Sequence, residues 1–292
     1  MFKPWLEVLL SFRRSPVFRS LLPAVLGTGL YAAAVVYVDQ NWFGRFVLIG
    51  AQLHGLLGLV LGLLLVFRTN TSYDRWWEAR KLWGQLVNDS RNLAIKVAVC
   101  VRTDSADKHR LAEYLAAFAW SLKDNLQGGR PLQTLSPFRD SPDQPRHVPI
   151  YIAGKIYGHV ERWRQTEKLD GFEFWVVDQH LAALMNVCGA CERILKTPIA
   201  FSYLWFIRQA IAVYLLTLPW GLVEPFGYWS IPATMLLGYL LIGVELLAES
   251  IENPFGDSID DLSLDAICRT IERDVTETLP AEGGSLSVNI SS

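Results

Sequence analysis

The sequence is poor in charged residues and lacks the pattern of a β-sheet protein. Charged residues make up 19% of 292 positions, below the ~25% of ordinary soluble domains, and the mean hydropathy is +0.22. Alternation of apolar and polar residues persists nowhere, so the chain is predicted to be all-α. The formal net charge of -2 leaves no basic excess, so we expect no nucleic-acid partner.

Cysteines are few and enzyme motifs are missing. The four cysteines make no disulfide framework. Cys188 and Cys191 have the CxxC spacing, but they lie inside a helical pattern, and zinc would need two further ligands. We interpret the pair as small-residue helix packing, with metal or redox chemistry as the alternative. The chain has no phosphate-binding glycine loop, GxSxG or HExxH, so we expect neither an enzyme nor a cofactor.

Four long apolar runs dominate the sequence, at 21–38, 46–67, 204–223 and 229–248. Each is long enough to cross the ~30 Å core of a bilayer, and together they predict two membrane hairpins. Basic residues flank the open end of the first hairpin, at Lys3, Arg13, Arg14, Arg19, Arg68, Arg75, Arg80 and Lys81. The positive-inside rule then places this end, and both termini, in the cytoplasm.

The stretch 56–92 changes from hydrocarbon to polar and basic within three residues of Phe67, without a proline. It predicts one helix that leaves the bilayer at Phe67 and continues into the cytosol. Helical periodicity predicts further helices at 69–102, 106–127, 149–168 and 172–197, and one from about 262 to 279. The proline-rich loop 128–149 has no helix signal, and Pro219 should kink or end the third span.

These patterns divide the chain into five segments. They are a first hairpin with its N-terminal extension (1–68), a cytosolic helical region (69–202), a second hairpin (203–250), an acidic loop with a cytosolic helix (251–280), and a tail expected to be disordered (281–292).

Two motifs carry a resemblance to a known family. They are FRTNTSYDRWWEARKLWG at 67–84 and IENPFGDSIDDLSLDAICRTIE at 251–272. Arg75-Trp76-Trp77 and the Asn-Pro-Phe-Gly at 253–256 are their most specific parts. The chain resembles the bacterial branch of the bestrophin family over about residues 1–280. The resemblance implies a homopentamer of all-α subunits in the bacterial inner membrane, with the second membrane helix of each subunit lining a central pore.

The resemblance also implies a narrow neck at Leu59, Leu63 and Phe67. Their i, i+4, i+8 spacing keeps them near one helical face, with a drift of about 40° per step. Five copies of each would form an apolar constriction that gates by excluding water. From spacing alone, ordinary lipid-facing or helix-facing side chains are the alternative.

A second, cytosolic constriction is implied on the helix at 172–197. Val177 and Leu181 are its candidates, and burial of both in a core is the alternative. The acidic loop retains only part of a calcium-binding run. Asp257, Asp260 and Asp261 remain, while Ser258 stands where a ligating aspartate is expected. We therefore expect no bound calcium, and interpret Asp260 or Asp261 as capping the helix that follows.

Three further expectations concern the membrane helices. Gly55, Gly58 and Gly62 should allow close helix packing. His54 should hydrogen-bond a neighbouring helix rather than line an outer vestibule. Arg208 and Glu245, at the inner ends of the last two spans, could pair with each other.

The resemblance implies an ion channel, and its bacterial branch implies conduction of monovalent cations such as sodium. Asp39 and Glu224 in the outer turns, against Arg45, lean slightly towards cations. A chloride-selective channel is one alternative. A membrane-anchored scaffold or sensor that binds a soluble cytosolic partner is another. The expected partners are copies of the same chain, membrane lipid and the permeant ions.

Overall fold

A computed structural model describes residues 16–43 and 50–281, and within these ranges every regular element is helical. The long helices are α2 (Pro16–Val38), α3 (Ala51–Cys100), α4 (Ser105–Leu126), α5 (Val148–Gln165), α6 (Gly171–Lys196), α7 (Phe201–Phe226), α8 (Ser230–Ser250) and α9 (Leu264–Thr278). The all-α prediction is confirmed for this part of the chain. Lys3, Arg13, Arg14, Arg45 and the tail from 282 lie outside the described residues.

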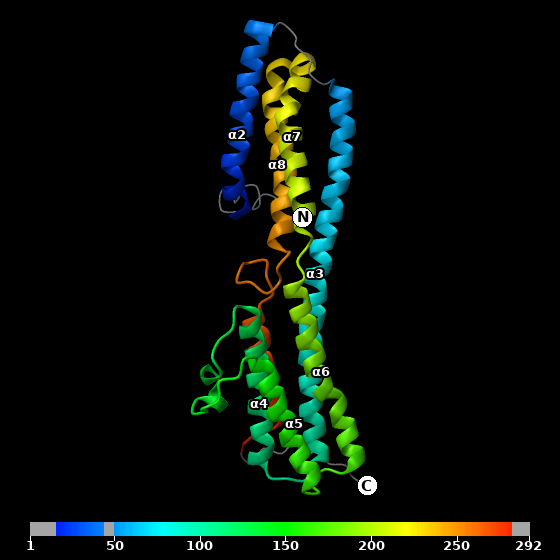
Figure 1. Ribbon diagram of the computed structural model, residues 1–292, viewed down its shortest axis with the longest axis vertical. Helices are drawn as coiled ribbons and strands as arrows, with labels where there is room; N and C mark the ends of the chain where they lie inside the picture. Colours follow the sequence, from blue (N-terminus) through cyan, green and yellow to red (C-terminus); the bar gives the residue numbers. More distant parts are fainter. Residues whose placement is uncertain (1–15, 44–49, 282–292) are drawn as a thin grey trace, which may run out of the picture. The chain divides into compact units, whose positions relative to one another are not determined.

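The chain divides into two compact units, the first of which comprises residues 1–74 and 198–252. In this unit α2, α7 and α8 pack closely side by side (Figure 1). Stretches long and apolar enough to cross a membrane are found at Arg19–Trp42, Gln52–Cys100 and Phe201–Ser250. The last contains both α7 and α8, which are joined by the short turn η5 (Gly227–Trp229). Gly227 has a φ of 52°, a conformation that glycine adopts without a Cβ clash.

Two details of the first unit add to the sequence prediction. Of the two outcomes predicted for Pro219, a kink or an end, the structure excludes the end, because α7 continues to Phe226. A proline removes one backbone N–H, and close packing against α8 can hold the helix through that gap. The polar turn predicted after the first span contains a π-helical turn, η2 (Asp39–Phe43).

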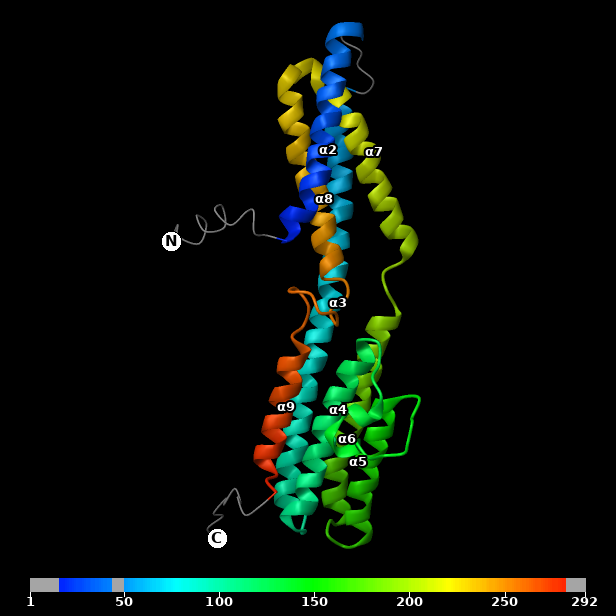
Figure 2. The ribbon, with the colours of Figure 1, turned by 90° about the vertical axis from the view of Figure 1, so that its left-hand side faces the viewer.

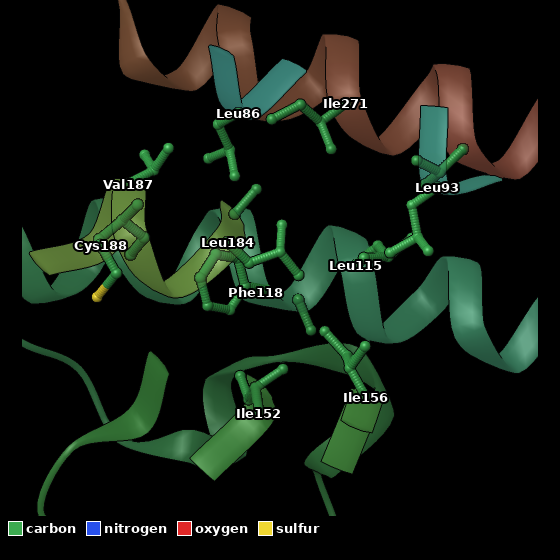
Figure 3. Close-up of a cluster of buried hydrophobic side chains, with 14 of the residues drawn as sticks. Leu86, Leu93, Leu115, Phe118, Ile152, Ile156, Leu184, Val187, Cys188 and Ile271 are labelled. Atoms are coloured by element: carbon green, nitrogen blue, oxygen red, sulfur yellow. The ribbon is translucent and has the colours of Figure 1, made fainter. Parts of the chain in front are cut away.

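The second unit comprises residues 75–197 and those from 253 onward. Helices α4, α5, α6 and α9 pack with the later part of α3 around one apolar core (Figure 2). Helix α9 packs against α4. Figure 3 shows side chains from all five helices meeting there, with Phe118 of α4 among them. Local sequence fixes the helix starts, since Asp104 caps α4 and Asp170 forms a capping box with Glu173 at α6.

The loops of this unit are more ordered than predicted. Residues 128–147 contain two single-turn 3₁₀ helices, Leu132–Thr134 and Ser136–Phe138, because Leu132 and Phe138 insert into the core. The prediction that Asp260 or Asp261 caps the next helix is wrong. Helix α9 begins at Leu264 with Ser263 at its N-cap, and the Asp261 carboxylate instead accepts a hydrogen bond of 2.6 Å from the Ser258 N–H.

Candidate functional site

The membrane part of α3 has one buried and one open face. The buried face repeats at intervals of three and four residues, through His54, Gly58, Leu61, Leu65, Arg68 and Ser72. The neck candidates Leu59, Leu63 and Phe67 are 73%, 56% and 55% exposed. At ~100° per residue, the two sets are centred about 180° apart around the helix. The neck candidates therefore share the face that the described part of the subunit leaves uncovered.

The buried face attaches α3 to α7 through side chains. His54 Nε2 lies 3.2 Å from Thr217 Oγ1, so the predicted hydrogen bond to a neighbouring helix is confirmed. Leu61 and Leu65 share an apolar cluster with residues of α7. A Cβ on Gly58 would lie 2.9 Å from the Tyr214 hydroxyl, so close packing is confirmed at that glycine.

The packing prediction is wrong for Gly55 and Gly62 within the described subunit. A Cβ added at either position would meet no atom within 4 Å. Gly55 lies on an open part of the helix surface, and Gly62 lies beside the buried face rather than on it.

An ion network joins α3, α7 and the end of α8. The guanidinium of Arg68 is completely buried, with Nη2 2.8 Å from Glu252 Oε2 and Nε 3.5 Å from Glu245 Oε2. Arg208 binds Glu245 at 3.1 Å and Glu249 at 2.8 Å. The predicted pairing of Arg208 with Glu245 is confirmed. The role of Arg68 was missed, because its partners come from the end of α8, a distant part of the sequence.

The two acidic vestibule candidates have different environments. Asp39 is only 5% exposed in its π-helical turn, whereas Glu224 is exposed near the end of α7. A carboxylate enclosed by its own subunit does not present its oxygens to the water of a pore. Asp39 therefore no longer supports the vestibule assignment, and Glu224 is retained.

Val177 and Leu181 both lie in the core of the second unit. Their side chains are enclosed by their own subunit and have no surface to present to a passing ion. The structure therefore agrees with the alternative given above, that both residues are buried in a core, and not with a constriction. The outward face of α6 instead carries Phe172, Val176 and Gln179.

One potential metal-ligand group is present among the described residues, formed by His147, Cys188 and Glu192. Glu192 Oε1 accepts from His147 Nε2 at 2.5 Å, from Asn125 Nδ2 at 3.0 Å, and from Cys188 Sγ at 3.7 Å. His147 Nδ1 accepts the Ile150 N–H, so Nε2 carries the proton and offers no lone pair to a metal.

This group is therefore a hydrogen-bonded hub that ties the proline-rich loop to α6. Burial raises the pKa of Cys188 and of Cys191 to about 12, so both thiols stay protonated at neutral pH. Neither redox nor metal chemistry is favoured at the CxxC. The sequence could not reveal the hub, because His147 lies in a segment without a periodic pattern.

The acidic loop does not gather its carboxylates. Asp257 accepts from Gln127 Nε2 at 3.1 Å, and Asp261 accepts from the Ser258 N–H. Among the described residues, Asp257, Asp260 and Asp261 do not form a group of converging ligand atoms. Calcium needs six to eight oxygen ligands, and this arrangement does not favour it.

Comparison with known proteins decides the family. The family model described as Bacterial/Fungal Bestrophin protein matches residues 2–277. The chain belongs to the bestrophin family. A relative from Nostoc sp. is 33% identical over 304 aligned positions, which cover 99% of this chain and 95% of the relative. A relative from Escherichia coli K12 is 30% identical over 278 positions, covering 94% and 91%. Both are named voltage-dependent anion channel-forming proteins.

A solved bestrophin shares the fold. The crystal structure of a bacterial bestrophin homologue from Klebsiella pneumoniae superimposes with a TM-score of 0.82 at 27% identity, covering 90% of this chain and 99% of that one. The resemblance inferred from the motifs is thereby confirmed.

The bestrophin motifs act as structural ties within the second unit. Arg75 donates to the backbone carbonyls of Thr197 and Ile194, at the C-terminal end of α6, where the helix dipole favours a cation. Trp76 Nε1 donates to the Asp260 carbonyl at 3.0 Å. Phe255, within the Asn-Pro-Phe-Gly motif, is buried in the core. These residues stabilise the packing of the second unit. The candidate conduction residues lie on the open face of α3.

Proposed function

We propose that this bestrophin forms a homopentameric ion channel in the bacterial inner membrane. Helices α2, α7, α8 and the first half of α3 are its four spans, with both termini in the cytoplasm. The open face of α3 lines the pore, which is narrowest at Leu59, Leu63 and Phe67. The observation that carries this proposal is the division of α3 into a sealed face and an open apolar face.

Around a five-fold axis, the open faces would enclose a tube with no polar group at its narrowest part. An ion crossing such a tube loses hydration that nothing replaces, so the apolar rings act as a gate. Gly58, His54 and Arg68 hold the opposite face against the subunit, and this leaves the open face free to line the tube.

The permeant ions in this proposal are monovalent cations such as sodium. An apolar neck does not choose the sign of an ion, so fixed charges at its mouths decide the preference. Anion conduction is the second candidate, because the named relatives are anion channel-forming proteins.

Ion flux into liposomes tests the proposal. Purified full-length protein should first give an oligomer of five 33.0 kDa subunits by native mass spectrometry. Liposomes containing it should take up sodium faster than protein-free liposomes. Uptake of chloride alone would favour the second candidate. If well-formed oligomers take up neither ion, and those of the Leu63→Ala variant do not either, the channel proposal fails. A scaffold or sensor then becomes the better explanation.

A further inference from the structure

The face of α3 that carries the neck candidates continues to Asp74. Asp74 lies seven residues beyond Phe67, which places it about 20° from Phe67 around the helix and about 10 Å further along it. Asn70, one turn beyond Phe67, lies on the same face. Both side chains are exposed. The open face thus changes from hydrocarbon to an amide and then to a carboxylate.

Two of the basic groups near Asp74 in the sequence bind partners elsewhere. The guanidinium of Arg75 donates to the carbonyls of Thr197 and Ile194. Arg68 is buried on the opposite face with Glu245 and Glu252. Among the described residues, Asp74 takes part in none of the ion pairs, so no direct ion pair within the subunit offsets its negative charge.

Distance along the helix separates the effect of Asp74 from that of the next cation. Lys81 occupies the same face another seven residues on, about 21 Å from Phe67 at ~1.5 Å per residue. The Debye length at physiological salt is about 8 Å. Lys81 is therefore more than two Debye lengths from the neck and Asp74 little more than one, so the charge of Asp74 is screened much less there than that of Lys81.

We infer that Asp74 determines the sign of ion selectivity. This rests on the proposed pentameric channel, in which five Asp74 carboxylates would ring the inner mouth of the neck. Such a ring raises the local concentration of cations and opposes the entry of anions. The apolar rings would then decide whether ions pass, and Asp74 would decide which.

Reversal potentials of Asp74→Asn test the inference. In a planar bilayer under a NaCl gradient, the wild-type protein should show a reversal potential near the sodium equilibrium potential. Asp74→Asn keeps the shape and removes the charge, so the sodium-to-chloride permeability ratio should fall several-fold. Asp74→Glu should retain the wild-type ratio. Asp140→Asn, which removes an exposed carboxylate from a loop outside α3, is the matched control and should change nothing.

The outcomes separate this inference from the proposed function. If the wild-type protein passes no current, each Asp74 substitution is combined with Leu63→Ala and measured again. Absence of current in these double variants as well would overturn both proposals. A conducting channel whose reversal potential is unchanged by Asp74→Asn would overturn the inference and leave the channel standing. A wild-type channel that selects anions would also overturn the inference and leave the channel proposal standing.

Discussion

Arg68 and Arg208 bind the same carboxylate, Glu245, from different environments. The Arg68 side chain is 0% exposed, and it also holds Glu252 and the Ser72 hydroxyl. The Arg208 side chain is 48% exposed, and it also reaches Glu249. Water can solvate the guanidinium of Arg208 when its ion pairs break, but it has no access to the guanidinium of Arg68. The two arginines therefore form a matched pair for measuring what burial adds to an ion pair.

We expect Arg68→Ala to lower the free energy of unfolding by about 3 kcal/mol, because it leaves buried acid without its cation. Arg208→Ala should cost less than about 1 kcal/mol, as is usual for exposed pairs. Thermal unfolding of both variants in the same detergent measures the difference. Equal losses would mean that burial does not govern this network.

Burial also lowers the reactivity of three of the four cysteine thiols, because it raises their pKa. It raises the pKa of Cys188, Cys191 and Cys268 from 9.0 to about 12. At pH 8 only about one in ten thousand of each is the reactive thiolate. Because the folded-state pKa exceeds the unfolded value, these thiols support folding fully below pH 9. Their contribution is lost as the pH rises from 9 towards 12.

We therefore predict that iodoacetamide at pH 8 labels only Cys100 quickly in the native protein. Mass spectrometry should show one modified site before unfolding and four after it. In Cys100→Ser, fast native labelling should disappear and the unfolded chain should gain three adducts. Rapid native labelling of Cys188 would show that the hub around Glu192 opens.

At the scale of elements, the helices were the most predictable part of the fold. The lack of proline between 56 and 92 predicted the continuous helix that became α3. Periodicity predicted the starts of α4 and α6 to within one residue, and capping residues precede both helices in the structure. The loops were less predictable, because the 3₁₀ turns depend on burial of Leu132 and Phe138, which is a tertiary effect.

The candidate site was predictable in part. Spacing alone placed Leu59, Leu63 and Phe67 on one face, but it could not show that this face is the open one. The environments of Asp39 and Val177 could not be predicted either, because an acid in a turn and an apolar residue in a helix are equally common at surfaces and in cores. The partners of Arg68 are contributed by distant segments that no local pattern connects.

Packing between α3 and α7 can be tested at the glycines. Gly58→Ala should cost about 1 kcal/mol, because its Cβ would collide with the Tyr214 hydroxyl and displace a largely buried ring. Gly55→Ala and Gly62→Ala meet open space and should change stability by less than about 0.5 kcal/mol. Thermal unfolding of the three variants compares them. If Gly62→Ala lowered the stability of the dissociated subunit as much as Gly58→Ala does, the packing described here would be contradicted.

At the scale of the whole molecule, α3 cannot be understood from one subunit. Its open face is apolar through the membrane stretch and turns polar at Asn70 and Asp74. In the proposed pore, the hydrocarbon part of this face would control passage and the carboxylate would act on ions in water.

The most direct test is the single-channel current of Leu63→Ala beside that of Leu57→Ala. Both leucines are exposed on α3, but Leu57 lies about 120° away from the neck face. In planar bilayers with symmetrical NaCl, and with oligomers of equal mass, we expect a larger or more frequent current for Leu63→Ala and wild-type behaviour for Leu57→Ala. A Leu63→Ala channel indistinguishable from wild type would contradict the claim that this face forms the gate.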